Sequence, residues 1–235
     1  MTEAMWVPLS PAEWEVLTLS LRVGLMAVAL TLPIALFAAY ALARWSFPGK
    51  ALVNGIVHLP LVLPPVVTGY LLLITFGPQA PLGRVLEAVG LPIAFRWTGA
   101  AVAAGVMALP LMVRAIRLSL EAVDPRLEQA AATLGASRAA VFVTVTLPMA
   151  LPGVIAGTIL GFAKALGEFG ATITFVSNIP GETRTLPLAI YSFLQIPGGE
   201  GAAARLVIFA VVLSMGALLV SEWIAARAAR RVAGA

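Results

Sequence analysis

The residues most capable of chemistry in this chain are charged and hydroxyl-bearing side chains that lie within or beside apolar stretches. Lys164 and Glu168 stand four positions apart, so they can pair across one turn of a helix. Charges inside a membrane are costly and face either a partner or a water-filled path. We therefore interpret this pair as part of a path for a polar solute, with a purely structural ion pair as the alternative.

A glycine-containing, hydroxyl-rich segment follows the pair. Hydroxyl and amide groups can bond an oxyanion without holding it tightly, as the lining of a gate or pore requires. The candidates in this segment are Phe169, Gly170, Thr172, Thr174, Ser177 and Asn178. Pro64 and Pro65 join them, because proline interrupts the helical hydrogen-bond ladder and the freed carbonyl groups must be buried in protein or face water.

Several kinds of chemistry are excluded by what the sequence lacks. The chain has no cysteine and one histidine, His58, so thiolate chemistry and a metal site are not expected. It contains no G-x-x-x-x-G-K-[ST] stretch that could cradle nucleotide phosphates. It also contains no Ser/His/Asp set. We predict no catalytic residue, metal or cofactor in this chain, and we expect a partner to supply the energy.

A short polar stretch between two apolar ones predicts a helix with well-defined ends. Asp124 is a favourable N-cap, Pro125 suits the first helical position, and Gly135 can adopt the left-handed conformation that ends a helix. One face of this helix is apolar and carries Leu127, Ala130, Ala131 and Leu134. A helix lying on lipid is the alternative, but an alanine-rich face fits a socket in a protein better.

These elements must be positioned by membrane-spanning helices. The chain has 235 residues, of which 60% are hydrophobic and 11% charged, whereas soluble domains carry about 25% charged residues. The apolar residues gather in blocks that approach the roughly 20 residues needed to cross a bilayer. We predict an all-α membrane protein with five transmembrane helices, over residues 16–43, 54–76, 98–117, 147–172 and 206–226.

Basic residues orient the predicted helices. One set of connecting segments contains Arg44, Lys50, Arg114, Arg117, Arg126, Arg138, Arg227, Arg230 and Arg231. The opposite set contains Arg84, Arg96, Arg184 and Arg205. Because basic residues are enriched on the cytoplasmic side, the larger set is predicted to be cytoplasmic, with the N-terminus outside and the C-terminus inside. Anionic lipid head groups then account for the net charge of +4, and no nucleic acid is expected.

Two further features concern packing and topology. Gly153, Gly157 and Gly161 recur at every fourth position and form a flat ridge for helix packing, either within one subunit or across a dimer. Residues 185–195 are apolar but too few to span a bilayer, so they predict an outer-surface or re-entrant helix. A sixth span at this place is the main rival topology, and it would put the C-terminal arginines outside.

The 124–148 stretch resembles the EAA loop of ABC importer permeases. Gln129-Ala130-Ala131, Gly135 and Leu147-Pro148 have the spacing of that motif, although Gln129 replaces its glutamate and Glu128 stands one position earlier. The resemblance implies a coupling helix that docks into a groove on a separate ATP-hydrolysing subunit, where ATP and Mg bind. The coupling residues it implies are Asp124, Leu127, Glu128, Gln129, Ala130, Ala131, Leu134, Gly135, Leu147 and Pro148.

This resemblance covers nearly the whole chain and implies the type I ABC importer permease fold. Residues 47–50, 58–69 and 167–185 are similar to the bacterial molybdate permeases, which implies transport of molybdate and of the similarly sized and charged tungstate. Sulfate/thiosulfate permeases are the alternative, because they share the Glu168-Phe169-Gly170 turn. The resemblance also implies a second copy of the chain, two ATP-binding subunits, an extracytoplasmic oxyanion-binding protein and the bacterial inner membrane.

The chain is expected to divide into an external N-terminal segment (1–15), a transmembrane domain (16–227) and a cytoplasmic basic tail (228–235). Two other classes of protein were weighed. A secondary transporter would need a coupling-ion site near the bilayer midplane, often with repeat symmetry, and the sequence offers neither. A membrane-embedded enzyme would need a reactive constellation, which Lys164 and Glu168 alone do not supply.

Overall fold

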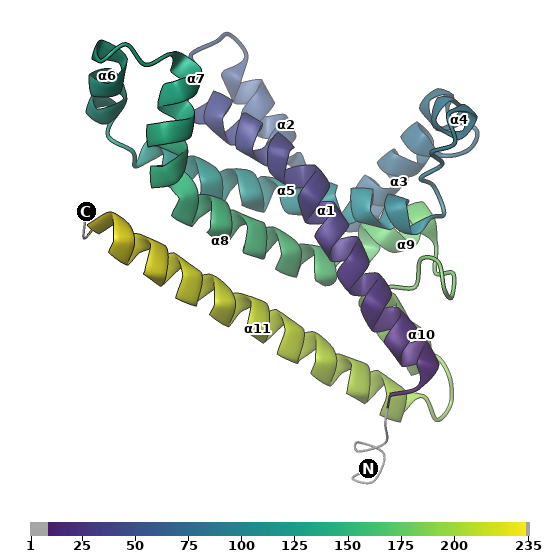
Figure 1. Ribbon diagram of the computed structural model, residues 1–235. Helices are drawn as coiled ribbons and strands as arrows, with labels where there is room; N and C mark the ends of the chain where they lie inside the picture. The colour runs from purple at the N-terminus through teal and green to yellow at the C-terminus, as the bar shows by residue number, and fades with distance from the viewer. Residues whose placement is uncertain (1–8, 234–235) are drawn as a thin grey trace.

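The computed structural model describes residues 9–233, and within this range every regular element is a helix (Figure 1). Residues 1–8 of the predicted external segment and residues 234–235 of the predicted tail lie outside the described residues. The remainder of that external segment contains the beginning of α1, which starts at Pro11. The described part of the predicted tail is the end of a helix that continues to Ala233.

Long apolar helices form the body of the described chain. Four stretches are long and apolar enough to cross a membrane. They are α1 (Pro11–Arg44), α5 (Trp97–Glu121), the continuous helical stretch Arg138–Leu166, and α11 (Glu200–Ala233). With 34 residues and a rise of about 1.5 Å per residue, α1 is longer than the ~30 Å hydrocarbon core, as its sequence predicts.

The second predicted span is two helices instead of one. α2 (Lys50–Val62) and α3 (Pro65–Phe76) are bent by 114° at the break between them. Pro64 lies in this break and Pro65 opens α3, so the missing amide hydrogens prevent the ladder from continuing. If the two halves count as one span, the described residues have five candidate spans, and otherwise four.

The fourth predicted span, 147–172, is wrong at both ends. Its helical stretch begins earlier, at Arg138, and α8 ends at Leu166. A new helix, α9 (Gly170–Val176), follows after a short break. At this break the Glu168 carboxylate, one position before the N-cap residue Phe169, accepts a 3.0 Å hydrogen bond from the Ala171 N–H group in the first turn of α9. Hydropathy alone does not register it, because the apolar character continues on both sides.

Short helices connect the long ones. They are α4 (Pro81–Ala88), α6 (Pro125–Thr133) and α10 (Leu186–Leu194). The short helix predicted over residues 185–195 is therefore confirmed as α10. With nine residues it is far shorter than the roughly 20 residues that a span requires. The rival topology with a sixth span at this place is not supported.

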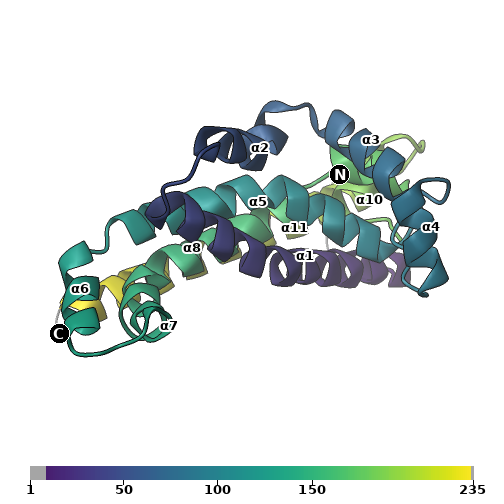
Figure 2. The ribbon, with the colours of Figure 1, turned by 90° about the horizontal axis from the view of Figure 1, so that it is seen from above.

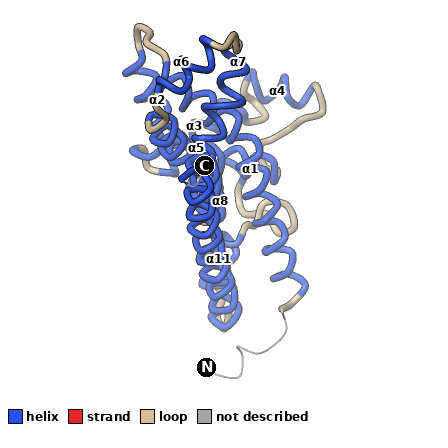
Figure 3. Tube along the Cα trace, turned by 60° about the vertical axis from the view of Figure 1, so that its left-hand side comes forward, coloured by secondary structure: helices blue, strands red, loops and turns tan. Residues whose placement is uncertain are grey.

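The connections gather at the two ends of the long helices. α6 and α7 (Arg138–Val141) lie at one end, together with the C-terminal end of α11, whereas α4, α10 and the start of α1 lie at the other (Figures 1 and 2). The chain trace in Figure 3 shows α8 (Leu147–Leu166) and α11 running along each other. The start of α1 and the C-terminal end of α11 therefore lie at opposite ends of the molecule (Figure 1).

Small residues allow the central helices to pack closely. α5 packs against both α1 and α8, and its buried face is rich in alanine and glycine. The glycine ridge of α8 lies against α5: a Cβ atom at Gly157 would stand 3.1 Å from the Met112 carbonyl oxygen, and one at Gly161 would stand 2.6 Å from the Met112 Sδ atom. A Cβ atom at Gly153 would collide with Ser119. The ridge therefore packs within the chain.

Polar contacts join the helices at the end of the molecule where α1 begins. The buried Glu13 carboxylate forms a capping box with Ser10 at the start of α1, and it pairs with Arg205 of α11 at 2.9 Å. The Ser20 hydroxyl accepts a 2.7 Å hydrogen bond from the Leu186 N–H group at the start of α10. These bonds join the first turns of α10 and α11 to α1.

Candidate functional site

α6 begins and ends at the residues expected from the sequence. Asp124 is the N-cap and its carboxylate accepts a 2.9 Å hydrogen bond from the Arg126 N–H group, while Pro125 occupies the first helical turn. Gly135 has φ +87°, the left-handed conformation that a helix end favours in glycine. The local sequence therefore accounts for where this helix begins and ends.

The backbone after α6 completes a two-bond helix stop. The Gly135 N–H group donates to the Ala132 carbonyl at 3.0 Å, and the Ala136 N–H group donates to the Ala131 carbonyl at 3.2 Å. This is the Schellman pattern, which satisfies carbonyl groups that a helix end leaves without partners. The apolar side chain of Leu134, immediately before Gly135, is left 89% exposed.

The surface of α6 is open to a partner. No residue of α6 is buried, and the side chains of Leu127, Gln129 and Ala130 are exposed. Ala131 is half-buried, so part of the predicted apolar face lies toward the chain itself. A small apolar face on a helix that projects from the body is a suitable knob for a complementary groove.

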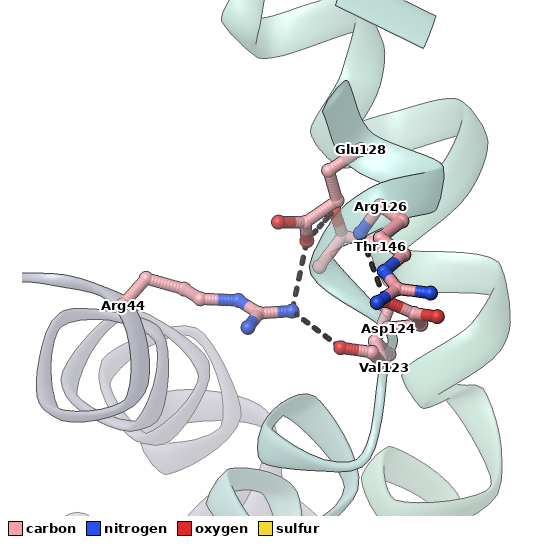
Figure 4. Close-up of polar contacts among 6 residues, drawn as sticks. All are labelled: Arg44, Val123, Asp124, Arg126, Glu128 and Thr146. Atoms are coloured by element: carbon pink, nitrogen blue, oxygen red, sulfur yellow. Dashed lines mark hydrogen bonds and ion pairs between the residues drawn. The ribbon is translucent and has the colours of Figure 1, made fainter. Parts of the chain in front are cut away.

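Glu128 points the other way, into the chain. Its carboxylate pairs with the Arg44 guanidinium at 3.0 Å and accepts a 2.7 Å hydrogen bond from the Thr146 hydroxyl (Figure 4). The same guanidinium nitrogen donates to the Val123 carbonyl at 3.2 Å. Glu128 therefore does not take the exposed place of Gln129, although both residues border the cavity beside α6.

Aromatic side chains lie beside this polar group. The ring of Tyr40 on α1 packs edge-on against Phe142 at 5.0 Å, and Trp45 packs against Tyr40 at 6.2 Å. A cavity of about 270 Å³ lies between α6 and these elements, with Tyr40, Phe142, Glu128, Ala132 and Thr146 among its lining residues. The inner side of α6 is thus not filled to the density of a core, which leaves α6 room to shift.

The Leu147-Pro148 pair lies where the helix widens. Residues Phe142–Thr146 form a π-helical segment, and the Leu147 N–H group bonds to the Phe142 carbonyl five residues earlier. A proline in a helix clashes with the carbonyl group four positions before it, here that of Thr144, and a π-turn is one way to relieve this clash. The pair therefore shapes the exit from the α6–α7 connection.

The proline break and the α8–α9 break meet in space. A Cβ atom at Gly170, the first residue of α9, would stand 2.8 Å from the Pro65 Cβ atom, and one at Gly69 would stand 2.5 Å from the Ala171 carbonyl oxygen. α3 and α9 thus lie in backbone contact. Two sequence segments about 100 residues apart, both chosen as pathway candidates, form one structural unit.

Lys164 and Glu168 form an ion pair at this place. The Lys164 ammonium group lies 2.6 Å from a Glu168 carboxylate oxygen, with side-chain exposures of 30% and 2%. The other carboxylate oxygen accepts the 3.0 Å bond from the Ala171 N–H group. Lys164 is in the last turn of α8 and Glu168 follows the helix end, so the two do not share a helix as the sequence suggests.

The hydroxyl-rich segment is mostly engaged within the chain. Thr172 is buried, and the Thr174 hydroxyl donates to the Gly170 carbonyl of its own helix. The Asn178 amide donates to Ser192 at 2.7 Å and accepts from Arg184 at 3.0 Å. Ser177 is exposed and has φ +66°. Phe169 packs against Tyr191 of α10. In this conformation Ser177 is the open hydroxyl of the predicted set.

Sequence reasoning missed the two side chains that bond the Glu128 carboxylate, Arg44 and Thr146. In the sequence, Arg44 is recognisable only as a basic residue at the end of a span, and Thr146 is recognisable only as part of an apolar connection. Arg44 and Glu128 are 84 positions apart, so no local spacing could have paired them. Among the described residues, no group of three or more His, Cys, Asp or Glu side chains could hold a metal ion.

Comparison with known proteins assigns the family. The model of the binding-protein-dependent transport system inner membrane component matches residues 31–234. The chain belongs to this family. It is 58% identical over 227 residues to the molybdenum transport system permease protein ModB of Escherichia coli K12, covering 96% of this chain and 99% of that protein. The Haemophilus influenzae ModB is 56% identical, with 94% and 96% covered.

The fold of this inner membrane component is also found in solved structures. A bacterial ABC transporter that imports alginate has a TM-score of 0.72 at 18% identity, covering 93% of this chain and 80% of that one. The predictions of an all-helical, multi-pass inner membrane protein with the ABC importer permease fold are confirmed. The family also assigns the chain to the membrane part of a transport system instead of to enzymes.

Proposed function

We propose that this chain is the permease subunit of an ATP-driven importer for molybdate, and that it also carries tungstate, which has nearly the same size and charge. The observation that carries the proposal is the similarity to two molybdenum permeases along almost the entire chain. A sulfate/thiosulfate importer is the second candidate named by the sequence, and the similarity to the two ModB proteins favours molybdate.

The energy is proposed to enter through α6. The helix is capped at both ends, carries an exposed small apolar face, and lies on the side that basic residues mark as cytoplasmic. We propose that it docks into a groove of a separate ATP-binding subunit through Leu127, Ala130, Ala131 and Leu134, with Gln129 at its exposed edge. ATP and Mg would bind to that subunit.

Two copies of the chain are proposed to form the pathway, each docked to one ATP-binding subunit. The broken helices α3 and α9 of each copy would supply a wall of the pathway, because interrupted helices at membrane depth occur where they are buried in protein or line a water-filled path. ATP binding would draw the two α6 helices together and turn the permease outward. Release of ADP and phosphate would return it inward, a rigid-body form of alternating access.

The orientation follows from the same proposal. The N-terminus would lie outside and the C-terminus in the cytoplasm, with α4 and α10 on the outer side. That side would receive a soluble oxyanion-binding protein, which selects the substrate. Exposed apolar side chains along α1, α2 and α11 suit contact with lipid or with the second copy.

Vesicle uptake tests the proposal. The chain is reconstituted with its ATP-binding subunit and an oxyanion-binding protein, and radiolabelled molybdate uptake is measured with and without ATP. We expect ATP-dependent uptake that excess tungstate competes for and excess sulfate does not. Uptake that continues without ATP and the ATP-binding subunit would contradict an ATP-driven importer, and preferred uptake of sulfate would favour the second candidate.

A further inference from the structure

Arg44 occupies a junction between four separate elements. It is the last residue of α1, and its guanidinium donates to the Glu128 carboxylate of α6 and to the Val123 carbonyl just after α5. Glu128 in turn accepts from Thr146 of the π-helical segment that leads into α8. We call these four residues the Arg44 junction (Figure 4).

The Arg44 junction is partly shielded from water. The side chains of Arg44 and Glu128 are 17% and 22% exposed, and Val123 is buried. Charges in such surroundings attract each other more strongly than exposed ones, because less water screens them. A guanidinium that bonds a carboxylate and a carbonyl together also fixes their relative positions.

The covalent chain does not connect α6 directly to α1. On one side α6 continues from α5, and on the other it leads through α7 and the π-helical segment into α8. α6 packs against α7 and the π-helical segment, which belong to the same continuous stretch. A displacement of α6 thus reaches α5 and α8 through the backbone. At this end of the molecule it reaches α1 through the packing of Tyr40 on Phe142 and through Arg44, which is the polar contact that joins α1 directly to α6.

We propose that Arg44 is a positioning residue that locks the coupling helix to α1, so that α1, α5 and α8 move as one body when α6 is displaced. This inference rests on the proposed function of α6 as the docking helix. It assigns the two neighbouring residues different tasks: Gln129, which is exposed although it borders the cavity, contacts the ATP-binding subunit, whereas Glu128 bonds Arg44 and transmits the displacement. Without the lock, α6 would shift into the adjacent cavity and the helices would follow only in part.

The test compares transport with ATP hydrolysis in the reconstituted complex of this chain, its ATP-binding subunit and the oxyanion-binding protein. The variants are Arg44→Met, Glu128→Met and the exchange Arg44→Glu with Glu128→Arg. Lys50→Met is the matched control, because it removes a cation from the same end of the molecule. The Lys50 ammonium group bonds the Trp45 carbonyl and not the Arg44 junction. The measured quantity is molybdate transported per ATP hydrolysed, together with co-purification of the ATP-binding subunit.

We expect each single variant to keep the ATP-binding subunit and to hydrolyse ATP, while transport per ATP falls by roughly three- to tenfold, which lies within the roughly 2- to 30-fold range in which mutations along a coupling path act. The exchange variant is expected to recover at least half of the loss, and Lys50→Met to match the wild type. A fall in assembly with an unchanged ratio would make Arg44 merely structural and overturn the proposal, as would an unchanged ratio in well-assembled variants.

Two further measurements separate a failure of the Arg44 proposal from a failure of the proposed function. If Arg44→Met does not assemble, Arg44→Lys and Thr146→Val, which each remove part of the junction, are measured in the same way and must lower the ratio. The wild-type complex is measured alongside. A wild type without ATP-dependent uptake would refute the proposed function, whereas a coupled wild type with equally coupled variants would refute only the role of Arg44.

Discussion

The short helix α6, proposed as the docking helix, and the α8–α9 break both interrupt the long helices, and each contains an ion pair. At α6 no residue is buried, and the pair of Arg44 and Glu128 joins elements far apart in the chain. At the break, Glu168 is 2% exposed and pairs with Lys164 four residues away. One pair therefore ties an exposed helix to the body, and the other holds the buried Glu168 carboxylate in the turn between two helices.

The comparison shows that an ion pair can serve two structural purposes: it can hold an exposed helix against distant elements, or it can hold a buried carboxylate in a turn between two helices. A helix that must dock on a partner has to leave its surface free, so its position is fixed by few contacts near its ends. A break in an apolar helix must have its polar groups bonded within the protein or facing a water-filled path, because lipid offers them no partner. Substitutions in the two regions are accordingly expected to separate loss of folding from loss of coupling.

The largest effect is expected from Glu168→Ala. It leaves the 30% exposed Lys164 ammonium without its partner, at a cost of about 1.5–3 kcal/mol of unfolding free energy, and the Ala171 N–H group without its acceptor, at a cost of about 1 kcal/mol. The control is Glu121→Ala, which removes an exposed pair with Arg117 at the same spacing and should cost less than about 0.5 kcal/mol. Thermal unfolding in detergent measures both, and equal losses would show that the break does not depend on its ion pair.

The next effect concerns the contact between α3 and α9. Gly69→Val places methyl groups against the Ala171 backbone, where a Cβ atom alone would stand 2.5 Å from the carbonyl oxygen. We expect a loss of about 1–3 kcal/mol from overpacking and a strong fall in molybdate uptake. Gly55→Val on α2 is the control, since nothing lies within 4 Å of its Cβ position. If both variants unfold at the same temperature, the close contact is not required.

A smaller effect on stability is expected from Gly135→Val at the end of α6. A β-branched residue at φ +87° costs about 1–2 kcal/mol locally, and the end of the docking helix should distort, so that ATP hydrolysis continues with less uptake. Gly198→Val, at φ +81° and with equally open surroundings, carries the same backbone strain in the connection between α10 and α11. Unchanged coupling in Gly135→Val would count against α6 as the docking helix.

The smallest effect on folding is expected from Ala130→Arg on the exposed face of α6. Stability should stay within about 0.5 kcal/mol, as for most surface substitutions, while association with the ATP-binding subunit should weaken roughly tenfold, or ~1.4 kcal/mol. Co-purification measures this. Ala88→Arg on the exposed surface of α4 is the control and should keep the subunit. Full retention by Ala130→Arg would remove that residue from the interface.

Much of the fold could be read from the sequence because it follows from local preferences. Asp124, Pro125 and Gly135 place the ends of α6 through backbone geometry and a neighbouring side chain, and the structure has both ends where they are predicted. The prolines at 64 and 65 likewise predict the break of the second span. The prediction of the fourth span was wrong because hydropathy does not detect a carboxylate that starts a new helix inside an apolar stretch.

The sequence by itself determined which long segments are helical and apolar enough for a membrane, and where the ends of α6 and the break at Pro64 and Pro65 fall, since these properties depend on residues within a few positions of one another. It did not predict α4 or the separate helix α9. Only the tertiary structure decided that Arg44 reaches Glu128, that the glycine ridge faces α5, and that the proline break meets α9. Such contacts join residues tens of positions apart, and they exist because small side chains let whole helices approach. No spacing within one segment encodes that approach.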